Sequence, residues 1–320
     1  MSLQQKRMKA GKDEFNFMEK KLKFRGGRKQ KLKYGWKNGR KIQNPWLHMS
    51  GVWLMGLLIV VVGWALGFLA CLFGVQFLDP DLGWVTAFFG PSLIVLIFIL
   101  AFCAAADRPV FKDFFHGLKG NTPSDFAKGM LLGFFLNAIC LIPGLIGSEV
   151  TLDPKTPSLL LYGRAGIAFG LVFIQACAME LVFRGYMFLN GRNRVPDWVN
   201  FTVSSILFAA VHLLDPDISW IGLLNYTAAG MLLATCVHFF DSLWMAIGLH
   251  AAWHFTSIII FGLPTAGIQS SLSIWTLQNT AGSFFYNNHS GLNGTPFAVL
   301  VICSMIGLMF FMGWCRKKDL

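Results

Sequence analysis

Long hydrophobic runs separated by short polar segments make up most of the chain after a polar N-terminal stretch. Eight runs are long enough to cross about 30 Å of hydrocarbon at roughly 1.5 Å of helix per residue. They lie near residues 50–76, 84–106, 127–148, 164–189, 198–214, 218–240, 242–262 and 296–315. The pattern predicts an all-α fold, a polytopic membrane bundle of about eight transmembrane helices formed by residues 49–320.

The composition indicates the same class of protein. Hydrophobic residues make up 55% of the chain and charged residues only 13%, whereas soluble domains contain roughly 25% charged residues. Between Ser242 and Cys315 there is no Asp, Glu, Lys or Arg. The seven cysteines are spread singly, so neither a disulfide framework nor a thiolate zinc site is indicated. An ordinary soluble fold is therefore excluded.

The positive charge is concentrated in a basic tail, residues 1–48. This tail holds 15 of the 27 Lys and Arg residues and only three acidic residues. Basic residues near a membrane surface attract anionic lipid headgroups by about 1 kcal/mol each. We interpret the tail as a cytoplasmic anchor that contacts the lipid bilayer and its anionic lipids. Contact with nucleic acid or the ribosome is the alternative.

The remaining basic residues predict the orientation. With the tail inside, 24 Lys and Arg residues fall on its side of the membrane and two on the other. By the positive-inside rule, both the N- and the C-terminus are expected in the cytoplasm of a plasma (inner) membrane protein. The long uncharged connection 263–295 then lies outside, and its aromatic residues indicate that it packs back on the bundle or re-enters it.

A few ionisable side chains lie within the hydrophobic runs. Such groups are costly at membrane depth and usually mark a functional site in the bundle interior. Glu180 and Arg184 are four residues apart in the fourth run, His212 lies in the fifth, and His250 and His254 are four apart in the seventh. Residues at this spacing share one face of a helix, which predicts a Glu180–Arg184 pair and a cavity shared by three helices. Three more polar residues would extend it: Asn137, Gln175 and Asn225. A purely structural polar lock between helices is the alternative.

Three segments carry a resemblance to a known family. Residues 178–186 resemble the Glu-Glu-x-x-x-Arg motif of the CAAX protease and bacteriocin-processing (CPBP/Abi) family. Residues 208–212 resemble its Phe-x-x-x-His motif, and residues 248–255 resemble its His-x-x-x-Asn motif. The resemblance covers about 164–262, and the third helix extends the family-like core to about 127–262. It implies an intramembrane endopeptidase that cuts prenylated proteins or processes peptides.

The resemblance also implies roles for individual residues. In the family, a glutamate and a histidine activate water, while an asparagine and a second histidine stabilise the oxyanion. His212 would be the water-activating partner, His250 an oxyanion or substrate-polarising group, and Glu180 and Arg184 a supporting pair. The sequence differs at two motif positions, with Met179 in place of the first glutamate and His254 in place of the asparagine. A methionine thioether cannot take a proton from water near neutral pH, so the usual general base is missing.

His254 introduces an alternative chemistry. Two histidines four residues apart on one helix suit two ligands of a metal ion. With His212 as a third ligand and the Glu180 carboxylate nearby, His250 and His254 could hold a divalent metal such as zinc. Arg184 would oppose this site because it neutralises Glu180. No other cofactor is indicated.

Three functions are compatible with these residues. The main hypothesis is a CPBP-family protein with lost or weakened peptidase activity, acting as a binding or assembly subunit with other membrane protein subunits. The first alternative is an active CAAX-type endopeptidase that uses Glu180, His212 and His250 on a peptide or prenylated protein substrate. The second is a transporter or channel lined by the same cavity, although no internal repeat is evident in the sequence.

Overall fold

The computed structural model describes residues 44–318, apart from 79, 216–217, 266–268 and 280–281. Nearly all of the basic tail therefore lies outside the described residues, and its lipid contacts stay a prediction. The first described helix begins at Pro45, four residues before the expected start of the bundle at 49.

Eight helical spans in the described part of the chain are long and apolar enough to cross a membrane. They are Pro45–Phe77, Leu82–Ala106, Pro123–Ile146, Leu159–Gly191, Asp197–Leu214, Trp220–Phe240, Leu243–Ile260 and Pro296–Cys315. The predicted mostly helical bundle with eight spans is thus confirmed. Every predicted boundary lies within five residues of the observed one.

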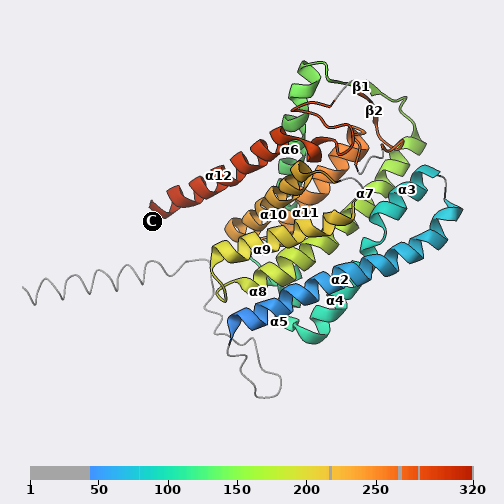
Figure 1. Ribbon diagram of the computed structural model, residues 1–320. Coiled ribbons are helices and arrows are strands. Elements are labelled where there is room, and N and C mark those ends of the chain that lie inside the picture. The colour runs from blue at the N-terminus through green and yellow to red at the C-terminus, as the bar shows by residue number, and fades with distance from the viewer. Residues whose placement is uncertain (1–43, 79, 216–217, 266–268, 280–281, 319–320) are drawn as a thin grey trace, which may run out of the picture. The chain divides into compact units, whose positions relative to one another are not determined.

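The spans are built from shorter elements, several of which follow one another without a break (Figure 1). In chain order the elements are α2 (Pro45–Gly74), η1 (Val75–Phe77), α3 (Pro80–Phe89), α4 (Ser92–Ala106), α5 (Arg108–Lys112), η2 (Asp113–Gly117), α6 (Pro123–Ile146), β1 (Val150–Pro154), α7 (Leu159–Glu180), η3 (Leu181–Phe188), α8 (Leu189–Gly191), α9 (Asp197–Ala210), η4 (Val211–Leu214), α10 (Trp220–Phe240), α11 (Leu243–His254), η5 (Phe255–Ile260), β2 (Trp275–Asn279), η6 (Leu292–Gly294) and α12 (Pro296–Lys318). The segments η2, η3 and η5 are π-helical.

Hydroxyl side chains cap the N-termini of α6, α7, α10 and α11. The side chain of Thr122 accepts a hydrogen bond from the backbone N–H of Asp125 at 3.1 Å and so caps α6. Ser158, Ser219 and Ser242 cap α7, α10 and α11 in the same way. Each cap satisfies a backbone donor that the first helical turn leaves without a partner. The sequence thus fixes where each of these helices starts.

Helix α11 lies at the centre of the bundle. In the most apolar 18-residue window of its span, 78% of the residues are buried, against 22% in the corresponding windows of the first and last spans. Glycines let α6 approach it closely: a Cβ atom added to Gly133 would lie 2.5 Å from the carbonyl oxygen of Leu249. Small residues at such crossings allow membrane helices to pack backbone against backbone. His250 and His254 are therefore carried by the most enclosed of the eight described spans.

A small sheet joins two connections that are distant in sequence. Strands β1 and β2 pair antiparallel, from Val150 opposite Asn279 to Pro154 opposite Trp275. The pair follows the C-terminal end of α6 and lies at one end of the bundle (Figure 1). Asn293 in η6 also accepts a hydrogen bond from Trp253 Nε1 at 2.9 Å. The connection 263–295 therefore packs back on the bundle, which is one of the two arrangements expected from the sequence. The pairing of β1 with β2 was not expected.

Candidate functional site

Glu180 is the centre of the buried polar cluster. It is the last residue of α7, and its side chain, like that of Arg184, is fully buried. Arg184 Nη1 donates to Glu180 Oε1 at 3.2 Å, and His250 Nδ1 lies 2.8 Å from the same oxygen. The predicted Glu180–Arg184 pair is confirmed. His250 joins it from α11, which the spacing along the chain did not indicate.

Arg184 is also fixed from two other helices. Its Nη2 donates to the carbonyl oxygen of Gly230 on α10 at 2.9 Å. Its guanidinium group lies 4.2 Å from the centre of the Phe208 ring on α9. A Cβ atom at Gly230 would lie 3.2 Å from Nη2, so the absence of a side chain there helps the arginine to reach the backbone. Arg184 therefore joins α9 and α10 to the span that carries Glu180.

The hydrogen bond to Glu180 sets the tautomer of His250. Because a carboxylate oxygen accepts, His250 Nδ1 is the donor in this contact. A neutral imidazole with its proton on Nδ1 has Nε2 as its acceptor. The ring of His254 lies 5.0 Å from that of His250, centre to centre, and both residues line one cavity. The prediction that the two histidines project from the same face of the helix is confirmed.

His212 forms a second carboxylate–histidine pair. It lies in η4, and its Nδ1 is 2.9 Å from Asp215 Oδ2. Its ring stacks on Tyr226, with 3.7 Å between ring centres and an angle of 4°. The Phe208 ring lies 5.5 Å from that of His212 and 5.7 Å from that of His250. Sequence reasoning missed Asp215 and Tyr226, although Asp215 is only three residues from His212.

The cavity beside these histidines is small. Its volume is about 30 Å³, which accommodates roughly two water molecules. It is lined by Leu136, Phe208, Asn225, Tyr226, Ala229, Leu232, Leu233, Leu249, His250, Trp253, His254, Asn293 and Ile302. The expected shared cavity is therefore formed only in part, because Glu180, Arg184 and His212 are not among its lining residues.

The three further polar residues expected at the cavity fall in different places. Asn225 lines it. Asn137 and Gln175 are buried but are not among its lining residues, and Asn137 Nδ2 donates to Trp253 O at 3.2 Å and to Ser257 Oγ at 2.5 Å. Asn293 enters from the connection between β2 and α12, and nothing in the local sequence indicated this.

The histidines are not arranged as the expected metal centre. Among the described residues, no group of three or more His, Cys, Asp or Glu side chains could hold a metal ion. The Nδ1 atoms of His250 and His212 instead contact two different carboxylates, Glu180 and Asp215. The ligand set of His212, His250 and His254 is thus not assembled in this structure.

Two π-helical segments flank the cluster. Segment η3 begins directly after Glu180, and η5 begins directly after His254. Single π-helical turns often occur at functional sites, because the wider turn changes which side chains face one another. The segment η3 contains Arg184, so the Glu180–Arg184 contact is made across a widened turn rather than a regular α-helical one.

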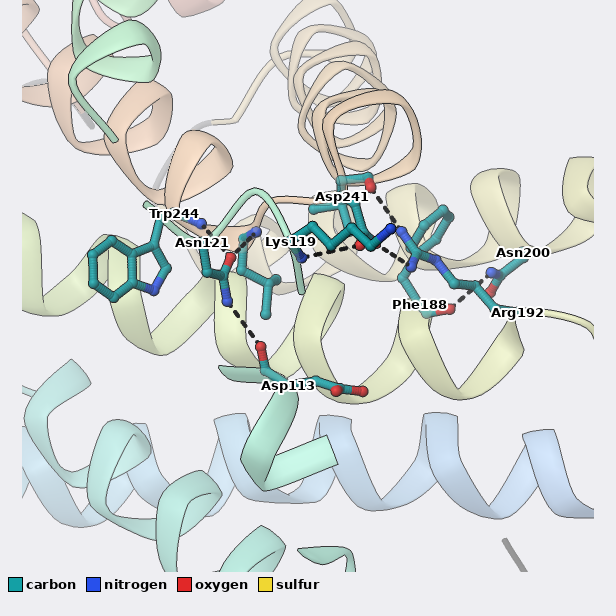
Figure 2. A network of polar contacts seen from close by, with 10 residues as sticks. Asp113, Lys119, Asn121, Phe188, Arg192, Asn200, Asp241 and Trp244 are labelled. Atoms are coloured by element: carbon teal, nitrogen blue, oxygen red, sulfur yellow. Dashed lines mark hydrogen bonds and ion pairs between the residues drawn. The ribbon is translucent and has the colours of Figure 1, made fainter. Parts of the chain in front are cut away.

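A second polar network includes Lys119 and Asn121, just before α6, and Asp241, between α10 and α11 (Figure 2). It lies near α8, at the end of the bundle away from β1 and β2 (Figure 1). Arg192 Nη1 is 2.9 Å from Asp241 Oδ1, and the backbone N–H of Lys119 donates to Asp241 Oδ2 at 3.2 Å. Asn121 Oδ1 accepts from the N–H of Leu243 at 2.8 Å. These contacts fix the turn between α10 and α11, where Asp241 has a left-handed conformation. The network positions α11 and is separate from the cavity.

The spans and the buried ionisable groups indicate a multi-pass membrane protein. Residues 159–256 match the family model of type II CAAX prenyl endopeptidases described as Rce1-like, and the chain therefore carries a CAAX protease family domain over these residues. The match confirms the resemblance carried by the three motifs. It begins with α7 and contains all five site residues, whereas α6 lies outside it. No curated protein sequence matches the chain significantly.

Proposed function

We propose that this membrane protein of the CAAX protease family has lost most or all peptidase activity and acts as a binding or assembly subunit with other membrane proteins. One observation carries the proposal. Met179 occupies the motif position of the first glutamate, and the remaining carboxylate, Glu180, is engaged by Arg184 and His250.

The engagement of Glu180 makes it a poor substitute for the missing base. Its Oε1 already accepts from two side chains. Its Oε2 has no hydrogen-bond partner among the described residues, but the side chain is fully buried and is not among those that line the cavity, so Oε2 has no access to water held there. General-base assistance typically contributes about 10²–10⁴-fold to a rate. A methionine at the position of the base removes this contribution.

The size of the cavity supports the same function. A volume of about 30 Å³ admits water, but a peptide backbone around a scissile bond needs several times more space. Cleavage would therefore require the helices around the cavity to separate. Binding of a peptide or prenylated protein at the surface of the bundle does not have this requirement.

One observation favours the alternative of an active endopeptidase. Glu180 orients His250 through Nδ1, and His250 lines the cavity. This is the arrangement by which a carboxylate orients the histidine base of hydrolytic triads. In this form of the alternative, His250 replaces His212, which the resemblance implies as the water-activating residue, because His250 lines the cavity and His212 does not. His250 Nε2 takes the proton of the attacking water and later donates it to the leaving amine. The transporter or channel stays a prediction that no observation here favours.

The test measures binding and cleavage separately. The purified full chain in lipid nanodiscs is incubated with a fluorescent farnesylated peptide, and fluorescence anisotropy and product formation are followed together. The proposal predicts no product above that of empty nanodiscs, even where the peptide binds. Turnover that His250→Ala abolishes, with the fold intact by circular dichroism, would establish the endopeptidase alternative instead.

A further inference from the structure

The connection between the second and third spans carries an exposed basic side. It is formed by α5 and η2, which follow one another, and by the residues after them up to 119. Arg108, Lys112, Phe115 and Lys119 are exposed and recur at a spacing of three or four residues. This spacing places side chains along one side of a helical segment. The segment thus presents three cations and an aromatic ring on the same side.

The opposite side of this segment is fixed to the helices that carry the candidate site. Val110, Phe114 and Leu118 are buried, with 2%, 2% and 8% exposure. The Phe114 ring packs on η3, because a Cβ atom added to Gly185 would lie 2.5 Å from its Cε1 atom. The carbonyl oxygen of Phe114 accepts a hydrogen bond from Trp244 Nε1 of α11 at 3.2 Å. Contacts with η3 and α11 therefore set which side of the segment faces outward.

The three exposed cations are not neutralised within the described part of the chain. None of the described residues forms an ion pair with their side chains. The preceding carboxylate, Asp107, accepts a hydrogen bond from Asn190 Nδ2 at 3.0 Å. Asp113 is the one acidic residue within 108–119, against three basic residues. The outward side therefore has an excess of positive charge and suits an anionic ligand.

The segment lies where the membrane surface is expected. The second span ends at Ala106 and the third begins at Pro123, so α5 and η2 lie between the ends of two spans. In Figure 1, α5 lies at the end of the bundle away from β1 and β2. An exposed aromatic ring among cations is typical of segments that lie in the headgroup region of a bilayer. Phe115, whose side chain is 39% exposed, favours a lipid over a soluble anion.

We propose that this segment binds the headgroups of anionic phospholipids, with Arg108, Lys112 and Lys119 on the phosphates and Phe115 among the acyl chains. The positive-inside rule predicts that it faces the cytoplasmic leaflet, which is rich in anionic lipids. Each basic residue near such a surface contributes a factor of about five in affinity. Because the buried side of the segment contacts η3 and α11, bound lipid stabilises the folded bundle. The surface is separate from the basic tail, goes beyond the proposed function and does not depend on peptidase turnover.

The test measures the midpoint of thermal unfolding of the full chain in micelles of an uncharged detergent. Phosphatidylglycerol, phosphatidylcholine or soluble glycerol phosphate is added in parallel. The surface variant, Arg108→Gln with Lys112→Gln, removes two cations from the segment. The tail variant, Lys6→Gln with Lys9→Gln, is the matched control, because it removes the same charge elsewhere. The exchange variant, Arg108→Lys with Lys112→Arg, keeps both cations.

Phosphatidylglycerol should raise the midpoint of the native chain by a few degrees more than phosphatidylcholine does. The surface variant should lose most of this rise, whereas the tail and exchange variants should keep it. Without lipid, all forms should unfold within about a degree of one another, because changes to exposed side chains usually have small effects on stability. Equal rises in the surface and tail variants, or no rise in the native chain, would overturn the proposal. A rise of the same size with glycerol phosphate would also overturn it, because the acyl chains would then contribute nothing.

Discussion

Replacing Arg184 by alanine should destabilise the bundle more than any change to an exposed ion pair. The guanidinium is fully buried and holds Glu180 Oε1 at 3.2 Å, Gly230 O at 2.9 Å and the Phe208 ring at 4.2 Å. Its removal leaves the buried Glu180 carboxylate with His250 as its remaining side-chain partner. Removing one member of a buried pair costs about 3–5 kcal/mol, and this figure already includes much of the lost hydrogen bonding. We expect a loss in that range.

Two matched variants separate the charge effect from the packing effect. Arg192→Ala breaks a pair with Asp241 whose side chains are 28% and 33% exposed, together with a bond to Val237 O. It should cost only about 1–2 kcal/mol. The double variant Glu180→Gln with Arg184→Met removes both buried charges and keeps an acceptor for His250. It should recover most of the stability, because a buried pair can often be replaced by uncharged residues of similar volume.

The free energy of unfolding can be measured by SDS titration in mixed micelles, with the 11 tryptophans as the fluorescence signal. The order predicted is Arg184→Ala least stable, then Arg192→Ala, with the double variant near the native protein. A loss from Arg184→Ala no larger than that from Arg192→Ala would refute the interpretation that the buried charge of Glu180 depends on its arginine.

Three further predictions concern the helix packing, a buried hydrogen bond and the orientation in the membrane. Gly133→Ala should destabilise the protein in the same titration, because the added Cβ would lie 2.5 Å from Leu249 O. The control Gly166→Ala meets no atom within 4 Å and should stabilise α7 by up to about 1 kcal/mol. Equal effects of the two substitutions would contradict the close packing of α6 on α11. Asn293→Ala removes the acceptor of buried Trp253 Nε1 and should cost about 1–3 kcal/mol, so an unchanged unfolding midpoint would argue against that contact. Both termini should resist membrane-impermeant labelling of introduced cysteines in intact cells, and labelling of either would overturn the predicted orientation.

The spans were predictable because the bilayer imposes a length on each helix that hydropathy alone reveals. The Glu180–Arg184 pair was predictable because it depends only on spacing within one span. The bond from His250 to Glu180 was not, since it depends on the register between two helices, which glycine contacts such as Gly133 against Leu249 help to set. The place of Asn293 depends on a long connection whose path no local pattern encodes. Helix lengths and intrahelical contacts could thus be predicted, whereas the closed geometry of the site required the tertiary structure.

We propose that Met179 and the contacts of Glu180 with Arg184 and His250 leave the Rce1-like region without a general base. The most direct test compares single-turnover cleavage of a farnesylated membrane peptide by the native chain and by the double variant Met179→Glu with His254→Asn, both in nanodiscs. We expect no measurable cleavage by the native chain and a rate at least about 10²-fold higher in the double variant, because general-base assistance is restored. Robust cleavage by the native chain, lost in His250→Ala and not increased in the double variant, would contradict it.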